Sequence, residues 1–236
     1  MRRIKNFRIL IAALFFLAAG LTEAFAAGIT IPAGSSLNVN SGTLNVAGDV
    51  TNAGTLLLTL GSITLSGNWS NTGTFTAGTG TVNFTGGIAV TQTLNSGGTG
   101  AGKLFYHLTH SGAGTLQLTT NAIDVDGNFN NSAGTFDANG KAISCVGNWT
   151  NSATYTHNNN SVTLDGTNQT LTGPTTFYTL SKTVTSAATL TFDNTATQTI
   201  TNSLTLQGAS GQPLSLRSDA AVAYNRNSSA PGSLIR

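Results

Sequence analysis

Carboxylates are the residues of this sequence whose spacing first suggests chemistry. Beyond Glu23, every acidic residue is an aspartate, and Asp124 and Asp126 form the one close pair. Residues i and i+2 of a strand share a face, so this pair could bind calcium or act as acid and base in polysaccharide cleavage. The other aspartates are scattered, and no glutamate completes a calcium loop. We therefore interpret Asp124 and Asp126 as solvent-exposed carboxylates, and assign no catalytic residue and no metal ligand.

The histidines and the single cysteine offer less chemistry. His107 and His110 are three residues apart, which places them on opposite faces of a strand, and His157 is remote in sequence. No Gly-x-Ser-x-Gly motif marks a nucleophile, and no motif indicates a cofactor. Cys145 stands in an apolar stretch, so we expect a small buried hydrophobe rather than a reactive thiol.

Two residue types could instead form a binding surface. Trp69 and Trp149 could be platforms for sugars, but the equivalent position of the repeat described below holds Phe129 and Val50, which favours core packing. Outward threonines on a flat sheet could bind ice, although threonine also favours strands for its own reasons. The threonines that alternate along expected strands are Thr91, Thr93, Thr197, Thr199 and Thr201.

A repeated motif must position all of these residues. The segments that begin Gly67-Asn68-Trp69 and Gly147-Asn148-Trp149 recur with Phe at residue 129, and a weaker copy begins at Gly48. The leading glycines stand at positions 48, 67, 127 and 147, so every gap between them is close to a multiple of about 20. A fixed period of this size is typical of a solenoid.

Short segments such as Leu44-Asn45-Val46 alternate apolar with polar residues between glycine-rich turns, which predicts half-buried strands. We predict an all-β, right-handed parallel β-helix over residues 27–216, with about 20 residues and three strands per turn and about nine turns. Trp69 and Trp149 would lie four turns apart. Gly97–Gly102 would be a flexible surface insertion, and the asparagines of the motif would form an amide ladder: Asn71, Asn131 and Asn151.

The amino terminus predicts export. A basic start, an apolar run over residues 9–21 and Ala24-Phe25-Ala26 indicate a signal peptide over residues 1–26. The apolar run is shorter than the roughly 18 residues that a membrane span needs. After removal of the signal peptide, six Lys and Arg and seven Asp remain, a net charge of −1. With no basic patch, nucleic acid is a poor candidate partner. We expect no membrane span in the mature chain and an extracellular or cell-surface location.

The carboxyl terminus carries a further expectation. Residues 217–236 are polar and irregular, and we interpret them as a tail that ends a truncated repeat array. A terminal turn leaves backbone groups unpaired, so we expect end-to-end self-association.

The units Gly-Asn-Trp-x-Asn-x-Gly-Thr-Phe, Thr-Val-x-Phe-x-Gly, Gln-Thr-Leu and Phe-Tyr-x-Leu recur between about Leu37 and Leu216. In these units the chain resembles the β-helical repeats of bacterial surface and secreted proteins of the filamentous-haemagglutinin and autotransporter-passenger type. The resemblance implies surface display with an adhesin-like or structural, non-catalytic role, and host-cell or matrix glycans or other surface proteins as partners. A carbohydrate-active β-helix enzyme, lyase or hydrolase, and a threonine-face ice-binding protein are the alternatives.

Overall fold

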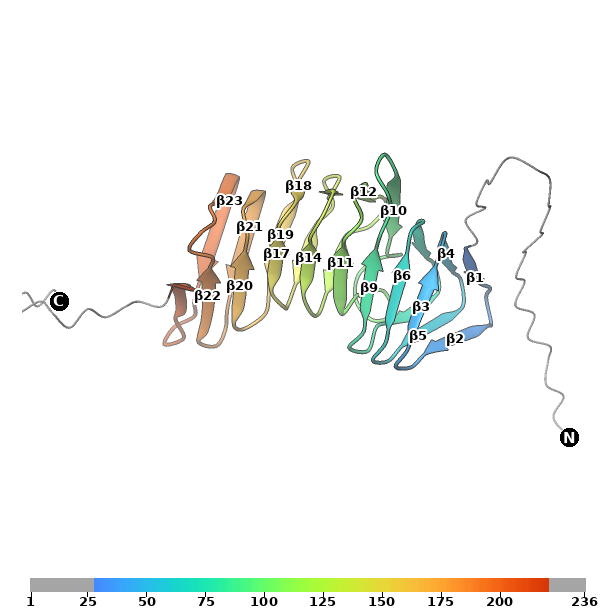
Figure 1. Ribbon diagram of the computed structural model, residues 1–236. Coiled ribbons are helices and arrows are strands. Elements are labelled where there is room, and N and C mark those ends of the chain that lie inside the picture. Colours follow the sequence, from blue (N-terminus) through green and yellow to red (C-terminus); the bar gives the residue numbers. More distant parts are fainter. Residues whose placement is uncertain (1–27, 221–236) are drawn as a thin grey trace, which may run out of the picture.

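The chain forms a β-solenoid. The computed structural model describes residues 28–220, which contain 24 strands and no helix, wound into one elongated coil (Figure 1). Within this part of the chain, no helix could cross a membrane. The expected signal peptide over residues 1–26 and residues 221–236 of the expected tail lie outside it.

Most turns contribute one short strand to each of three faces, because apolar residues alternate with polar ones and glycine-rich bends separate the strands. Face 1 consists of β1 (Ile29–Ile31), β4 (Val50–Asn52), β7 (Trp69–Asn71), β10 (Thr91–Asn95), β12 (Thr115–Leu118), β15 (Thr135–Asp137) and β18 (Thr154–Thr156). Face 2 consists of β2 (Ser36–Val39), β5 (Thr55–Leu58) and β8 (Thr74–Thr76), followed by β13 (Ile123–Val125), β16 (Ile143–Cys145), β19 (Ser161–Leu164), β21 (Thr175–Thr183) and β23 (Gln198–Gln207). Face 3 consists of β3 (Thr43–Val46), β6 (Ser62–Leu65), β9 (Thr81–Phe84), β11 (His107–His110), β14 (Phe129–Asn131), β17 (Trp149–Asn151), β20 (Gln169–Thr172), β22 (Ala188–Phe192) and β24 (Leu214–Ser218).

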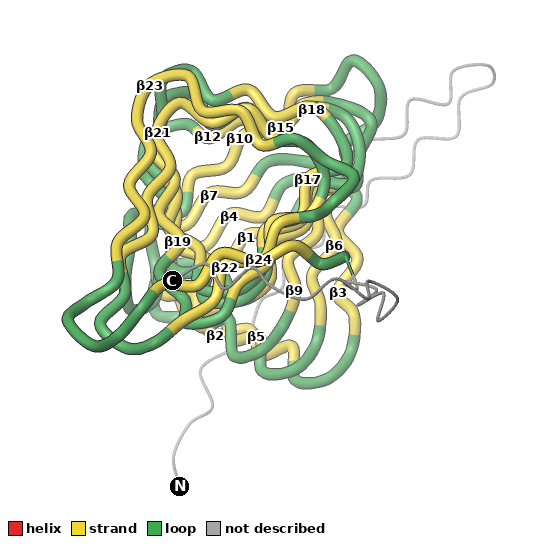
Figure 2. The backbone as a smooth tube through the Cα atoms, turned by 90° about the vertical axis from the view of Figure 1, so that its left-hand side faces the viewer, coloured by secondary structure: helices red, strands yellow, loops and turns green. Residues whose placement is uncertain are grey.

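All pairs between these strands are parallel, each strand bonding its equivalent one turn away, as in β6 and β9, where Ile63 lies beside Val82. Figure 2 looks at the carboxyl-terminal end, and β17, β18 and β19 follow one another counter-clockwise as the chain approaches the viewer. The coil is therefore right-handed, and the predicted fold class is confirmed.

Face 2 is interrupted once, at the glycine-rich insertion. Between β8 and β13 the chain from Gly97 to Gly102 loops out, and only Phe105 bridges to Val125. The insertion is bound to the turns on both sides, since the Phe75 amide donates to the Gly102 carbonyl (2.8 Å) and the Gly100 amide donates to the Asp124 carboxylate (2.8 Å). It is a surface insertion, as expected, but one with defined partners.

The spacing of the repeated motif does not equal a whole number of turns. On face 1, Trp69 pairs with Leu94 and Leu94 pairs with Leu118, so both of these turns are longer than the other turns of face 1. Phe129 and Trp149 then pair with each other on face 3. The segment from Trp69 to Phe129 therefore covers two and two-thirds turns, so the expectation that Trp69 and Trp149 are four whole turns apart was wrong.

The Gly-Asn pair has the same structural role in the motif copies at residues 67–68 and 147–148. A Cβ on Gly147 would collide with the Gly127 carbonyl one turn below, so only glycine allows this close approach. The side-chain oxygen of Asn148 accepts a bond from the Thr170 amide (2.9 Å), and that of Asn68 does so from the Thr93 amide (2.7 Å). The asparagine therefore binds a backbone amide of the strand one turn further along the chain.

The motif's aromatic residues form two separate buried clusters because of this change of face. Trp69, Phe75 and Phe105 make one, with ring centroids 4.9 to 5.7 Å apart. Phe129 and Trp149 are stacked at 4.0 Å in the other, which Phe136, Tyr155 and Phe177 complete. Both tryptophans are fully buried, which confirms core packing rather than sugar platforms.

The amide ladder exists, but as two ladders at different bends. Asn52 donates to Asn71 (2.9 Å) at the bend after face 1. At the bend after face 3, Asn131 donates to Asn151 (2.8 Å), and the Nδ1 atom of His110 lies 2.9 Å from the Asn131 oxygen. The expected stacking of Asn71 with Asn131 was wrong, because the motif changes face between them.

The buried histidine predicts acid sensitivity. Burial lowers the pKa of His110, and the bond to Asn131 only partly opposes this. The unfolded chain therefore binds a proton more readily below about pH 6.5, so this histidine lowers the free energy of unfolding as pH falls. We expect His110→Asn, whose amide can continue the ladder, to reduce the loss of stability between pH 7.5 and pH 5 in urea titrations.

Asn52→Ala, in the ladder that contains no histidine, is the matched control. It leaves the Asn71 side-chain oxygen without its donor at every pH, and should cost about 1–3 kcal/mol at both pH values. An unchanged acid response in His110→Asn would contradict this account of the histidine.

Candidate functional site

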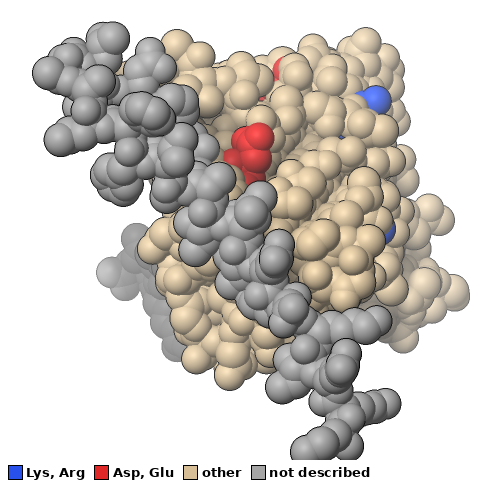
Figure 3. Space-filling view, turned by 90° about the vertical axis from the view of Figure 1, so that its right-hand side faces the viewer, with Lys and Arg blue, Asp and Glu red and all other residues tan. Residues whose placement is uncertain are grey.

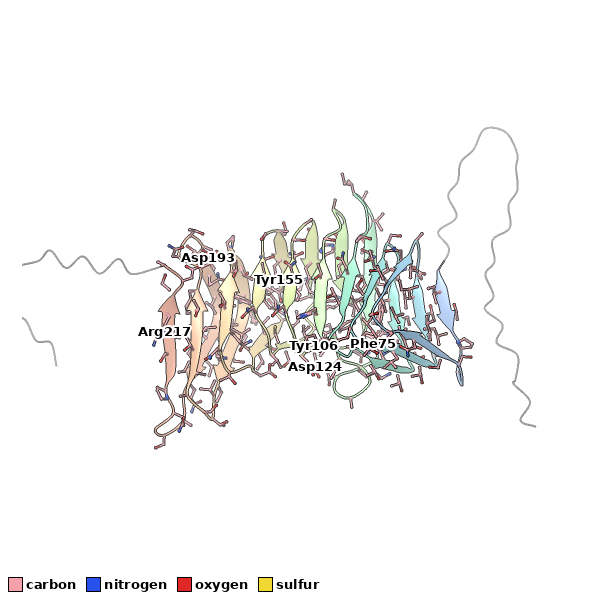
Figure 4. All side chains as sticks on the ribbon, turned by 60° about the horizontal axis from the view of Figure 1, so that its bottom comes forward. Phe75, Tyr106, Asp124, Tyr155, Asp193 and Arg217 are labelled. Carbon is pink, nitrogen blue, oxygen red and sulfur yellow. The ribbon has the colours of Figure 1, made fainter. Side chains whose placement is uncertain are left out.

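The two predicted carboxylates have different surroundings. Asp124 is partly buried and its carboxylate accepts the Gly100 amide of the insertion (Figure 4), whereas Asp126 follows β13 and is exposed. Desolvation, and then the charges of Asp124 and Asp165, raise the pKa of Asp126. Residues 28–220 contain no cluster of three or more His, Cys, Asp or Glu that could hold a metal ion.

The two neighbouring histidines and the cysteine point in the directions predicted from the alternation of inward and outward residues along a strand. His107 points outward and its Nδ1 atom accepts the Asn128 amide (2.9 Å), while His110 points inward, so the two histidines do not meet. Cys145 is fully buried, and burial raises the pKa of its thiol to about 12. A thiol that stays protonated at neutral pH is a poor nucleophile, as the expected packing role requires.

The threonines singled out from the sequence belong to two different faces. Thr91 and Thr93 lie on β10 of face 1, whereas Thr199 and Thr201 lie on β23 of face 2 and Thr197 precedes that strand. They therefore do not form one surface. On face 1 the strand register instead aligns an unbroken four-turn row of threonines: Thr91, Thr115, Thr135 and Thr154.

Face 3 carries the longest regular surface. Asparagine or threonine occupies the same outward position in seven successive strands, at Asn45, Thr64, Asn83, Thr109, Asn130, Thr150 and Thr172. A second row beside it holds Thr43, Ser62, Thr81 and His107. Parallel strands lie about 4.8 Å apart, so each row repeats hydroxyl and amide groups at that interval.

Charge is sparse around these rows. The strands of face 3 from β3 to β20 contain no Asp, Glu, Lys or Arg. Among the described residues, Figure 3 shows a few separate charged groups on the amino-terminal end of an otherwise uncharged surface. The complete rows were not predicted from the sequence, because turns of unequal length place the aligned residues at irregular sequence spacings.

The Gln-Thr-Leu units form buried corners that the sequence did not reveal. The Gln92 carboxamide donates to the carbonyls of Leu65 (3.2 Å) and Gly67 (2.5 Å) and accepts from the Gly86 amide (2.6 Å). Gln169 repeats this arrangement in a later turn. Each glutamine thus bonds two turns together from inside the coil.

The second corner also holds a buried lysine. Lys182 is fully buried, and its Nζ atom donates to the Gly166 carbonyl (2.5 Å) and to the Gln169 side-chain oxygen (2.6 Å). Desolvation lowers the pKa of Lys182, which the more distant Asp165 partly offsets. Lys182 is a structural cation held by oxygen atoms of one corner.

Comparison with known proteins gave no match: no protein family, no curated protein and no solved structure matches this chain. The solenoid and its repeat are therefore shown by the strand arrangement alone.

The Lys182 corner generates a prediction. Because the lysine pKa is lowered in the folded state, the unfolded chain binds the extra proton, and folding stability gains from this group as pH rises toward about 10.4. We expect Lys182→Met to remove that gain, and to cost about 1–3 kcal/mol at pH 7 because the buried Gly166 carbonyl loses the lysine donor.

Urea titrations at pH 7 and at pH 9.5 give the free energy of unfolding of wild type and of Lys182→Met. The difference between the two proteins at each pH isolates the lysine, because both proteins contain Cys145 and the tyrosines. A difference that stays the same at both pH values would contradict the lowered lysine pKa.

Proposed function

We propose that this chain is a non-catalytic, exported repeat protein of bacterial type, with an adhesin-like or structural role at the cell surface or outside the cell. The observation that carries the proposal is the uncharged, regular surface of face 3. Its proposed partners are host-cell or matrix glycans, or other surface proteins.

The chemistry of face 3 supports an extended neutral partner. Hydroxyl and carboxamide groups both donate and accept hydrogen bonds, and they cost less to desolvate than charges do. Because the rows run along the coil axis, a chain-like partner could meet the same group at every strand. An anionic polymer would find no row of cations here, which agrees with the expectation that nucleic acid is a poor partner.

Rigidity supports the same role. The parallel ladders, the two amide ladders and the glutamine corners fix successive turns to one another, so the rows need little further ordering on binding. Export and surface location rest on the sequence of residues 1–26.

The test uses a glycan array of neutral and acidic oligosaccharides with the secreted protein. Replacing both Asn130 and Thr150 by lysine places two charges in the row of face 3, and we expect it to lower binding at least about tenfold. Replacing Ser144 and Thr163, neighbours on face 2, by lysine is the matched control and should change binding by less than about threefold. Equal losses in both variants, or chain cleavage of any polysaccharide that Asp124→Ala and Asp126→Ala abolish, would contradict the proposal.

Ice binding is the second candidate, favoured by the four-turn threonine row of face 1. Thermal hysteresis of freezing is the direct measurement, with Thr115→Tyr as the variant that interrupts the row. Our proposal predicts no hysteresis in either protein. Hysteresis that Thr115→Tyr abolishes would establish ice binding in its place.

A further inference from the structure

A bend with no counterpart in the following turn creates a hollow on the surface. Between β18 and β19 the chain makes a tight turn at His157–Asn160, in which Asn158 and Asn159 have φ values of 47° and 65°. One turn later β21 runs as a single nine-residue strand, Thr175–Thr183. The turn therefore stands beside β21, and a hollow of about 490 Å³ opens between them.

The walls of this hollow are held in place before any ligand arrives. The His157 Nδ1 atom accepts the Asn159 amide (2.9 Å), and the Asn158 side chain donates to Asp137 one turn below (2.7 Å). The Asn160 side chain donates to the Tyr155 hydroxyl (2.8 Å), which fixes the floor. A preformed site avoids much of the entropy cost of binding.

The lining combines an aromatic surface with neutral hydrogen-bonding groups. His157 lines the hollow, and its ring stacks on the ring of Tyr178 beside the lining, with centroids 5.6 Å apart and an angle of 30° between the planes. Both residues are partly exposed. The remaining wall comes from the hydroxyls of Thr156 and Thr176 and the exposed Asn159 carboxamide. None of the residues that line the hollow is Asp, Glu, Lys or Arg.

We propose that this hollow is a binding site for a neutral oligosaccharide. The C–H face of a sugar ring is weakly positive and fits the electron-rich face of a tyrosine or histidine ring. The sugar hydroxyls find donors and acceptors in the threonines and in the asparagine. Phosphorylated or carboxylated ligands have no cation to pair with among the lining residues. This site is separate from face 3, so it goes beyond the proposed function and adds a second position where a neutral ligand binds.

The experiment measures binding of cellotetraose, chitotetraose and xylotetraose, with tetragalacturonate as the acidic comparison, by saturation-transfer NMR and calorimetry. We expect at least one neutral probe to bind, and Tyr178→Ala to weaken it at least about tenfold. Asn159→Gly keeps the positive φ of the turn, removes only the carboxamide, and should weaken binding about threefold or more.

Tyr106→Ala is the matched control, because Tyr106 forms a similar aromatic pair with His107 (centroids 4.5 Å apart) at the start of β11, whereas the hollow lies beside β18 and β21. Circular dichroism confirms that each variant folds. Binding that survives Tyr178→Ala and Asn159→Gly overturns the hollow as the site, and leaves the proposed function to its own test on face 3. Failure of all three neutral probes to bind, or stronger binding of tetragalacturonate, also overturns it.

Discussion

The backbone hydrogen bonds between successive turns are the interaction on which this molecule depends. A single turn has too few apolar side chains to bury by itself, and its strands have no partner within the turn. Stacking satisfies the amides and carbonyls and, in the same step, aligns equivalent side chains at about 4.8 Å. The amide ladders, the stacked Phe129 and Trp149 and the outward rows of face 3 are all consequences of that alignment.

The same constraint explains which residues repeat and why. Glycine recurs at bends where another backbone passes too close for a Cβ, as at Gly147. Asparagine follows it because its side chain can hold an amide of the next turn. The aromatic position accepts both Trp149 and Phe129 because both fill apolar volume, and the Trp149 ring N–H in addition donates to the Thr175 hydroxyl (3.2 Å). The repeated residues thus specify the bends and the core. The outward positions are not constrained by either and can vary with function.

Much of the fold could be predicted, because the alternation of apolar and polar residues and the period of the repeat are both visible in the sequence. The change of face between Trp69 and Phe129 could not, since it arises from two long turns whose extra residues add no strand. The continuation of the face 3 row from Asn83 to Thr109 was hidden for the same reason. The buried position of Lys182 depends on the Gly166 carbonyl of another turn, and the hollow beside Tyr178 depends on the uncovered bend at His157. No local sequence pattern reveals such contacts between turns.

The central claim is that pairing between turns of unequal length sets which residues are neighbours. Cysteine pairs in a Cys145→Ser background test it directly, because neighbouring parallel strands bring Cα atoms within the range of a disulfide. Ser70 and Asn95 pair on face 1 although 25 residues separate them, whereas Val90, one 20-residue period from Ser70 by sequence, precedes β10. The account predicts that mild oxidation joins cysteines at 70 and 95 and not those at 70 and 90. Cross-linking of the second pair without the first would contradict it.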